Sequence, residues 1–150
     1  AKLATFYNEA TISTEVEGPG YATIGALVQM NYPHLWRARW AEKSPGKISD
    51  QYGWSTTFKR KEWAIGHLLK LVVDRDITLH HDKTVAEMRN YVTLPAGGYG
   101  NAGGKDKHDD LVMALAIACI CASTEGPQMA YVGQEMNPAL EPIPSWDRGI

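Results

Sequence analysis

An apolar segment runs without interruption from Leu111 to Ala122, directly after the two carboxylates of Asp109 and Asp110. A segment of this composition has to be buried, and its length fits a helix that packs against other elements over most of its surface. Acidic side chains are favoured where a helix begins, because the first amide N–H groups have no partner inside the helix. The pattern therefore predicts a buried helix whose opening carboxylates are either a charged cap or a pair of metal ligands.

The bulk composition sets limits on the fold class and on the partners. A chain of 150 residues with 44% hydrophobic and 21% charged residues is typical of a globular protein with one domain. The net charge of −2 gives no global signal for nucleic acid, so any contact with DNA has to come from a local basic patch. Neither a membrane-spanning segment nor a signal peptide is visible. Cys119 and Cys121 lie inside the apolar segment, which predicts small buried side chains in a reducing compartment.

The rest of the chain predicts alternating strands and helices, which is typical of an α/β fold with a mixed sheet flanked by helices. The predicted helices cover residues 1–8, 21–30, 59–73 and 83–91, and the predicted strands cover 11–17, 35–40, 48–54 and 77–80. A glycine-rich loop over 95–107 leads into the apolar helix. We expect one domain over residues 1–124 and a proline-containing tail over 125–150.

Glu15 lies near the end of a predicted strand, immediately before Gly18, Pro19 and Gly20. A carboxylate at the carboxyl end of a strand in an α/β sheet is a common catalytic position, and the alternative is a solvent-exposed edge residue.

Together with the acids at the helix start, Glu15 could bind a divalent cation such as Mg²⁺ or Mn²⁺, since hard cations prefer oxygen ligands. Asp110 is the expected principal ligand, because it shares a helical face with the small residues Ala114 and Ala118. Asp109 lies about 100° away around the helix and is expected to support it.

Basic side chains occur at two places that could meet a DNA backbone. Lys59, Arg60 and Lys61 lie at the start of a predicted helix, and Lys105, Lys107 and His108 precede the apolar helix. Contacts of this kind give affinity that depends on salt and not on base sequence. The alternative for each of them is an ordinary solvent-exposed position.

Several motifs, taken in order over roughly residues 3–122, resemble the nuclease domain of tailed-phage terminase large subunits, a branch of the RNase H-like superfamily. The residues that carry the resemblance are Phe6-Tyr7-Asn8-Glu9-Ala10, Glu15-Val16-Glu17-Gly18-Pro19-Gly20, Tyr52-Gly53-Trp54-Ser55-Thr56-Thr57, Glu87-Met88-Arg89-Asn90-Tyr91-Val92 and Gly104-Lys105-Asp106-Lys107-His108-Asp109-Asp110-Leu111-Val112-Met113-Ala114. The ordered combination is far more specific than any single motif.

The resemblance implies a metal-dependent endonuclease that cuts concatemeric double-stranded viral DNA during genome packaging. The family's metal-binding acids fall on Glu15 and Asp110, with Asp109 beside them, and two Mg²⁺ or Mn²⁺ ions are implied. The implied partners are the phage portal protein, the small terminase subunit and an ATPase domain of the same polypeptide, in the host cytoplasm. The family also uses an aspartate on the first strand of its sheet. We therefore expect an N-terminally truncated fragment with a partial RNase H-like fold whose first strands are missing.

Two alternatives stay open at this point. The first is a RuvC-like or other RNase H-like nuclease, which would share the fold and differ in its DNA substrate. The second is a non-catalytic module that docks on DNA or on a portal and whose acids only cap a helix.

Overall fold

The computed structural model describes residues 1–41, 48–95, 97–102 and 108–124. The helices are α1 (Lys2–Phe6), α2 (Pro19–Gln29), α3 (Phe58–Val73), α4 (Asp82–Arg89) and α5 (Asp110–Thr124). The strands are β1 (Arg37–Ala41), β2 (Ile48–Tyr52), β3 (Tyr91–Thr93) and β4 (Tyr99–Asn101). The tail over 125–150 and the basic residues Lys105 and Lys107 lie outside the described residues. The α/β class expected from the sequence is confirmed.

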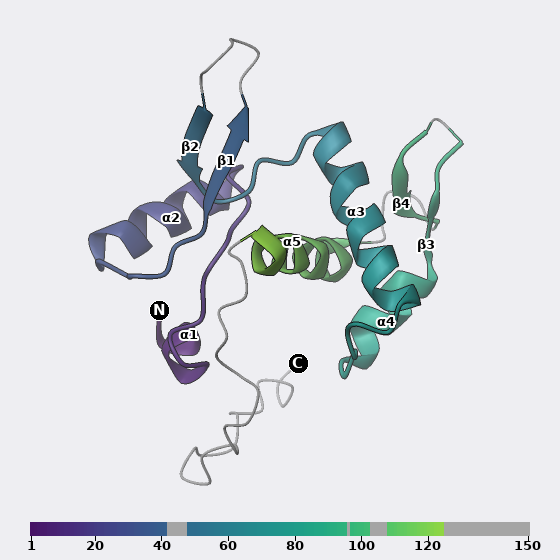
Figure 1. The fold of residues 1–150 in the computed structure, drawn as a ribbon, viewed down its shortest axis with the longest axis horizontal. Helices are drawn as coiled ribbons and strands as arrows, with labels where there is room; N and C mark the ends of the chain where they lie inside the picture. Colours follow the sequence, from purple (N-terminus) through teal and green to yellow (C-terminus); the bar gives the residue numbers. More distant parts are fainter. Residues whose placement is uncertain (42–47, 96, 103–107, 125–150) are drawn as a thin grey trace, which may run out of the picture.

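Helix α5 is the apolar helix that the sequence predicts, and it lies at the centre of the fold (Figure 1). Ala116 and Ile120 are completely buried in it, and Val112 is nearly so. Helices α3 and α4 pack against α5, and the core also includes Trp36 and Ala38 from the β1 region. Within the described ranges, none of the helices combines the length and the apolar character needed to cross a bilayer.

The sheet structure differs from the expected single mixed sheet. The described strands form two separate antiparallel pairs, β1 with β2 and β3 with β4. The predicted strand over 11–17 is an extended segment that makes only isolated parallel bridges, from Ile12 to Leu35 and from Glu15 to Trp54. Even so, these bridges place Glu15 beside the end of the β1–β2 hairpin.

Two other predictions need correction. Residues 77–80 form no strand, although Ile77 still packs against the core. The described part of the glycine-rich loop contains β4, which pairs with β3 through a turn that has positive φ at Gly97 and Gly98. The helices were predicted correctly, with ends that shift by at most two residues, as is usual at helix termini.

Three tryptophans join the hairpin to the helices. The ring of Trp54 is fully buried, stacks on Trp63 of α3 at 6.0 Å between centroids, and lies 6.2 Å from the ring of Trp36. The indole N–H of Trp36 donates to the hydroxyl of Thr124 at 3.3 Å, near the end of α5. The aromatic cluster therefore connects β1, α3 and α5.

The burial of α5 gives a test of the fold. Ala116→Leu adds volume at a fully buried position and should lower the free energy of unfolding by about 1–3 kcal/mol in a urea titration. Ala114→Leu, two residues earlier on the exposed side of α5, should change it by no more than about 0.5 kcal/mol. Equal losses in the two variants would contradict the packing described here.

Candidate functional site

An open groove of about 1260 Å³ separates the extended segment from α5. One wall is formed by Thr11 to Glu15, and the other by a largely apolar face of α5 that includes Ala114, Ala118 and Ala122. The polar residues that line this groove are Glu15, Glu17, Thr56, Lys61, Asp109 and Asp110. All three acids singled out from the sequence therefore line the same groove.

Two glycines fix the main chain beside Glu15. A Cβ added at Gly20 would lie 1.6 Å from the carbonyl oxygen of Glu15, so only glycine allows the start of α2 to come this close. On the other side Gly53 adopts a φ of +80°, and a Cβ there would lie 2.6 Å from the carbonyl oxygen of Thr14. These glycines explain why both the Gly18-Pro19-Gly20 and the Tyr52-Gly53-Trp54 motifs accompany this acid.

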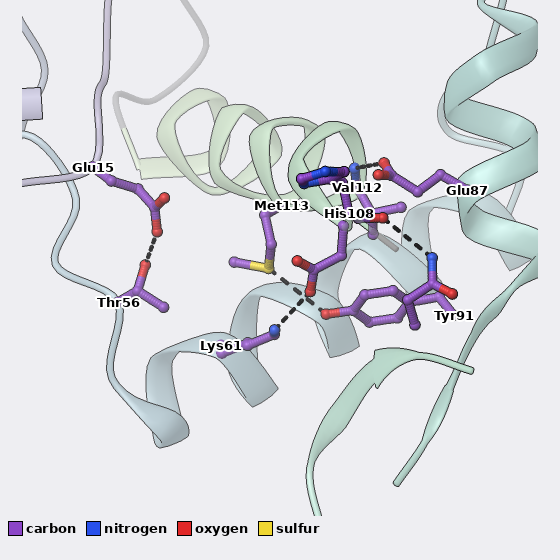
Figure 2. Close-up of polar contacts among 10 residues, drawn as sticks. Glu15, Thr56, Lys61, Glu87, Tyr91, His108, Val112 and Met113 are labelled. Atoms are coloured by element: carbon purple, nitrogen blue, oxygen red, sulfur yellow. Dashed lines mark hydrogen bonds and ion pairs between the residues drawn. The ribbon is translucent and has the colours of Figure 1, made fainter. Parts of the chain in front are cut away.

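Alternation along the extended segment then turns the Glu15 side chain towards the groove. Val16 is 7% exposed and points into the protein, whereas Glu15 is exposed. The carboxylate Oε1 of Glu15 accepts a hydrogen bond from the hydroxyl of Thr56 (Figure 2). Thr56 immediately precedes Thr57, whose side chain caps α3 by accepting from the amide of Arg60 at 3.3 Å.

Asp109 occupies the position before the first residue of α5, and its carbonyl oxygen accepts from the amide of Met113 at 2.9 Å. Its carboxylate is directed to α3, where Oδ2 lies 2.8 Å from Nζ of Lys61. Both side chains are about two-thirds buried, with exposed fractions of 28% for Lys61 and 31% for Asp109. The ion pair is thus partly shielded from water, and it joins α3 to α5.

The surroundings of this ion pair keep Lys61 charged. Burial lowers the pKa of the ammonium group, but the hydrogen bond and charge of Asp109, with a contribution from Tyr91, outweigh burial, and the pKa ends above its usual value. The ammonium also lies 5.8 Å from the centre of the Tyr91 ring. Desolvation is the main reason why the pKa of the Tyr91 hydroxyl is raised. This hydroxyl lies 3.8 Å from the sulfur of Met113 (Figure 2).

Asp110, the expected principal ligand, is far more accessible than Asp109. Its side chain is 81% exposed, and Oδ2 lies 3.4 Å from Nδ1 of His108, which is 85% exposed. The expected sharing of a helical face is confirmed, since Ala114 and Ala118 line the groove with Asp110. Asp110 is therefore open to solvent and to any ligand in the groove.

A fourth acid, Glu87, supports the site from α4 and was not singled out as a site residue. Its Oε2 accepts from the amide of Val112 at 2.8 Å, so it satisfies one of the first N–H groups of α5 (Figure 2). Lys61, which the sequence offers as a candidate DNA contact at the start of α3, lines the groove as the partner of Asp109.

The basic residues expected to contact DNA lie in different surroundings in the structure. Lys59 is exposed on α3 but does not line the groove. The guanidinium of Arg60 donates to the carbonyl oxygen of Ser55 at 3.1 Å, and His108 stands beside Asp110. Lys105 and Lys107 fall outside the described residues. Among the basic side chains in the described part of the chain, Lys61 is the one that lines the groove.

The donor set suits a hard divalent cation in its chemistry, because Glu15, Asp109, Asp110 and the hydroxyl of Thr56 are all oxygen donors around one groove. Within the described ranges, no three side chains of the Asp, Glu, His or Cys types come close enough together to form a metal cluster. The carboxylate of Asp109 is held by Lys61. The groove is therefore lined by oxygen donors of the kind that divalent cations prefer, but one of these donors, Asp109, is paired with Lys61.

Searches of protein-family models, of curated proteins and of solved structures found no match to this chain.

The contact from α4 can be tested through stability. Glu87→Ala removes the acceptor for the Val112 amide and should lower the free energy of unfolding by about 0.5–2 kcal/mol. Glu87→Gln keeps an acceptor oxygen and should lose less. Glu62→Ala, an exposed glutamate on α3, is the matched control and should stay within about 0.5 kcal/mol of the parent. A Glu87→Ala variant as stable as this control would show that the contact does not anchor α5.

Proposed function

We propose that this chain is the nuclease part of a terminase-type, RNase H-like endonuclease that cuts double-stranded DNA with the help of divalent metal ions. The observation that carries the proposal is the placement of Glu15 and Asp110 around one open groove, on segments that lie about 95 residues apart in sequence. The motif order and the glycines that hold Glu15 in place support the same interpretation.

Each of the groove's polar residues has a role in this proposal. Mg²⁺ or Mn²⁺ ions bound there would activate a water molecule and stabilise the leaving oxygen of a phosphodiester. Glu15 and Asp110 supply carboxylate oxygens for metal binding, and Thr56 orients Glu15 through its hydroxyl. Asp109 acts as a supporting acid in the same groove.

The biological setting in this proposal is the packaging of viral DNA. The substrate is concatemeric double-stranded DNA, and the protein partners are a portal protein, a small terminase subunit and an ATPase domain. The host cytoplasm is the proposed location. A RuvC-like nuclease would use the same groove, so comparison of linear duplex with four-way junctions as substrates separates the two activities.

A plasmid assay tests the nuclease activity and its residues together. The chain should convert supercoiled plasmid to nicked and linear forms in Mn²⁺, and EDTA should stop the reaction. Glu15→Ala and Asp110→Ala should each lower the rate by about 100-fold or more, because loss even of groups that only support a metal ligand costs 10–100-fold. Quantified gel bands over time give the rates.

The control for these variants is Asp74→Ala. Asp74 pairs with Lys70 at the far end of α3, so its loss removes a carboxylate without touching the groove. Cleavage at the parental rate by both groove variants would contradict the site assignment. Absence of metal-dependent cleavage by the parent chain would contradict the enzymatic proposal.

One observation favours a second function. Asp109 lies at the start of α5 and is paired with a lysine, which is how a purely structural acid behaves. A non-catalytic module that docks on DNA or on a portal would need no more than this. Such a module should bind duplex DNA equally well with and without Glu15 and Asp110, and should leave plasmid intact in Mn²⁺.

A further inference from the structure

Lys61 is placed differently from the other lysine that forms an ion pair on α3. Lys70 pairs with Asp74 one turn away on the same helix surface, and its side chain is 70% exposed. Lys61 reaches across to a different helix, is 28% exposed, and lines the groove together with the acid that it holds. The Lys70 pair is of the ordinary surface type, which contributes little to stability. The Lys61 pair lies where the proposed metal ions would bind.

The position of the ammonium resembles that of a cation bound to Asp109. Nζ of Lys61 lies 2.8 Å from Oδ2, the usual length of a charge-assisted hydrogen bond, so the ammonium covers an oxygen that a metal ion would need. A divalent ion at the same oxygen would place three positive charges around one carboxylate. Because like charges a few ångströms apart repel strongly in a partly buried site, the ammonium and the metal ion compete for Asp109.

We propose that the Lys61 ammonium occupies Asp109 in place of a divalent cation in the metal-free protein, and that metal binding exchanges one for the other. This inference rests on the proposed metal-dependent function and deepens it, since it assigns Asp109 as an exchangeable ligand. Asp110 and Glu15 are the ligands that are open from the start. The Lys61 ammonium therefore weakens metal binding at the groove, because it competes for Asp109.

The exchange also changes what the groove presents to a substrate. Lys61 released from Asp109 remains beside the groove and near the ring of Tyr91, so its charge stays at the same end. A free ammonium there is a suitable contact for a phosphate oxygen of DNA. Metal binding would thus produce both a filled acidic site and a cation that is available to the substrate.

Measurement of Mn²⁺ binding by titration calorimetry tests the exchange without relying on activity. Lys61→Met keeps the apolar stem and removes the competing charge, so Mn²⁺ should bind about fivefold more tightly than to the parent. Asp109→Asn should weaken binding, and Lys61→Met in the Asp109→Asn background should give no gain. Lys70→Met is the matched control and should bind Mn²⁺ like the parent chain.

A second readout follows the ion pair itself. In the absence of metal, thermal unfolding of the two single variants and the double variant should show that Lys61 and Asp109 are coupled. In saturating Mn²⁺ that coupling should disappear, because the metal ion has taken the place of the ammonium. Coupling of equal size with and without Mn²⁺ would overturn the exchange.

The outcomes separate this inference from the proposed function. If Glu15→Ala abolishes Mn²⁺ binding while Lys61→Met binds like the parent or more weakly, the exchange is wrong and the metal-dependent function stands. Weaker binding in Lys61→Met would make Lys61 a residue that positions Asp109. If the parent and every variant fail to bind Mn²⁺, the proposed function and the exchange are both overturned.

Discussion

The burial of one almost wholly apolar helix is the constraint on which the rest of the structure depends. Helix α5 carries no charged side chain after Asp110, so the other elements have to cover it, and α3 and α4 pack directly against it. Its first turn cannot be covered in the same way, because the amide groups there need acceptors. Acceptors and charges from other elements consequently meet the start of α5, and the groove runs from there along the helix as far as Ala122.

Charge balance at this end of α5 comes from three different elements. Glu87 of α4 accepts from the amide of Val112, and Lys61 of α3 neutralises Asp109. The positive end of the helix dipole favours acids here, and His108 lies beside the exposed Asp110. An acid in this place can cap a helix and can also bind a metal ion, so the two descriptions of Asp109 are not exclusive.

The helices and the β1–β2 hairpin could be predicted from the sequence, because they follow from periodicity and from turn residues. The contacts that Lys61 and Glu87 make could not be predicted, since their partners lie 48 and 25 residues away and no local pattern marks such contacts. The strand expected at 77–80 failed for a related reason. Residues 77–80 have a composition that favours a strand. A strand also needs a neighbouring strand with which to pair, and composition alone does not supply one.

The position of α5 near the end of the described chain has a consequence for biosynthesis. The contact from Trp36 to Thr124 spans 88 residues, so the hairpin and α3 leave the ribosome long before the helix that covers them. Contacts between distant segments form slowly, and until they form the apolar surfaces of the earlier segments are exposed to other chains. The groove therefore lacks one of its walls until α5 has been made.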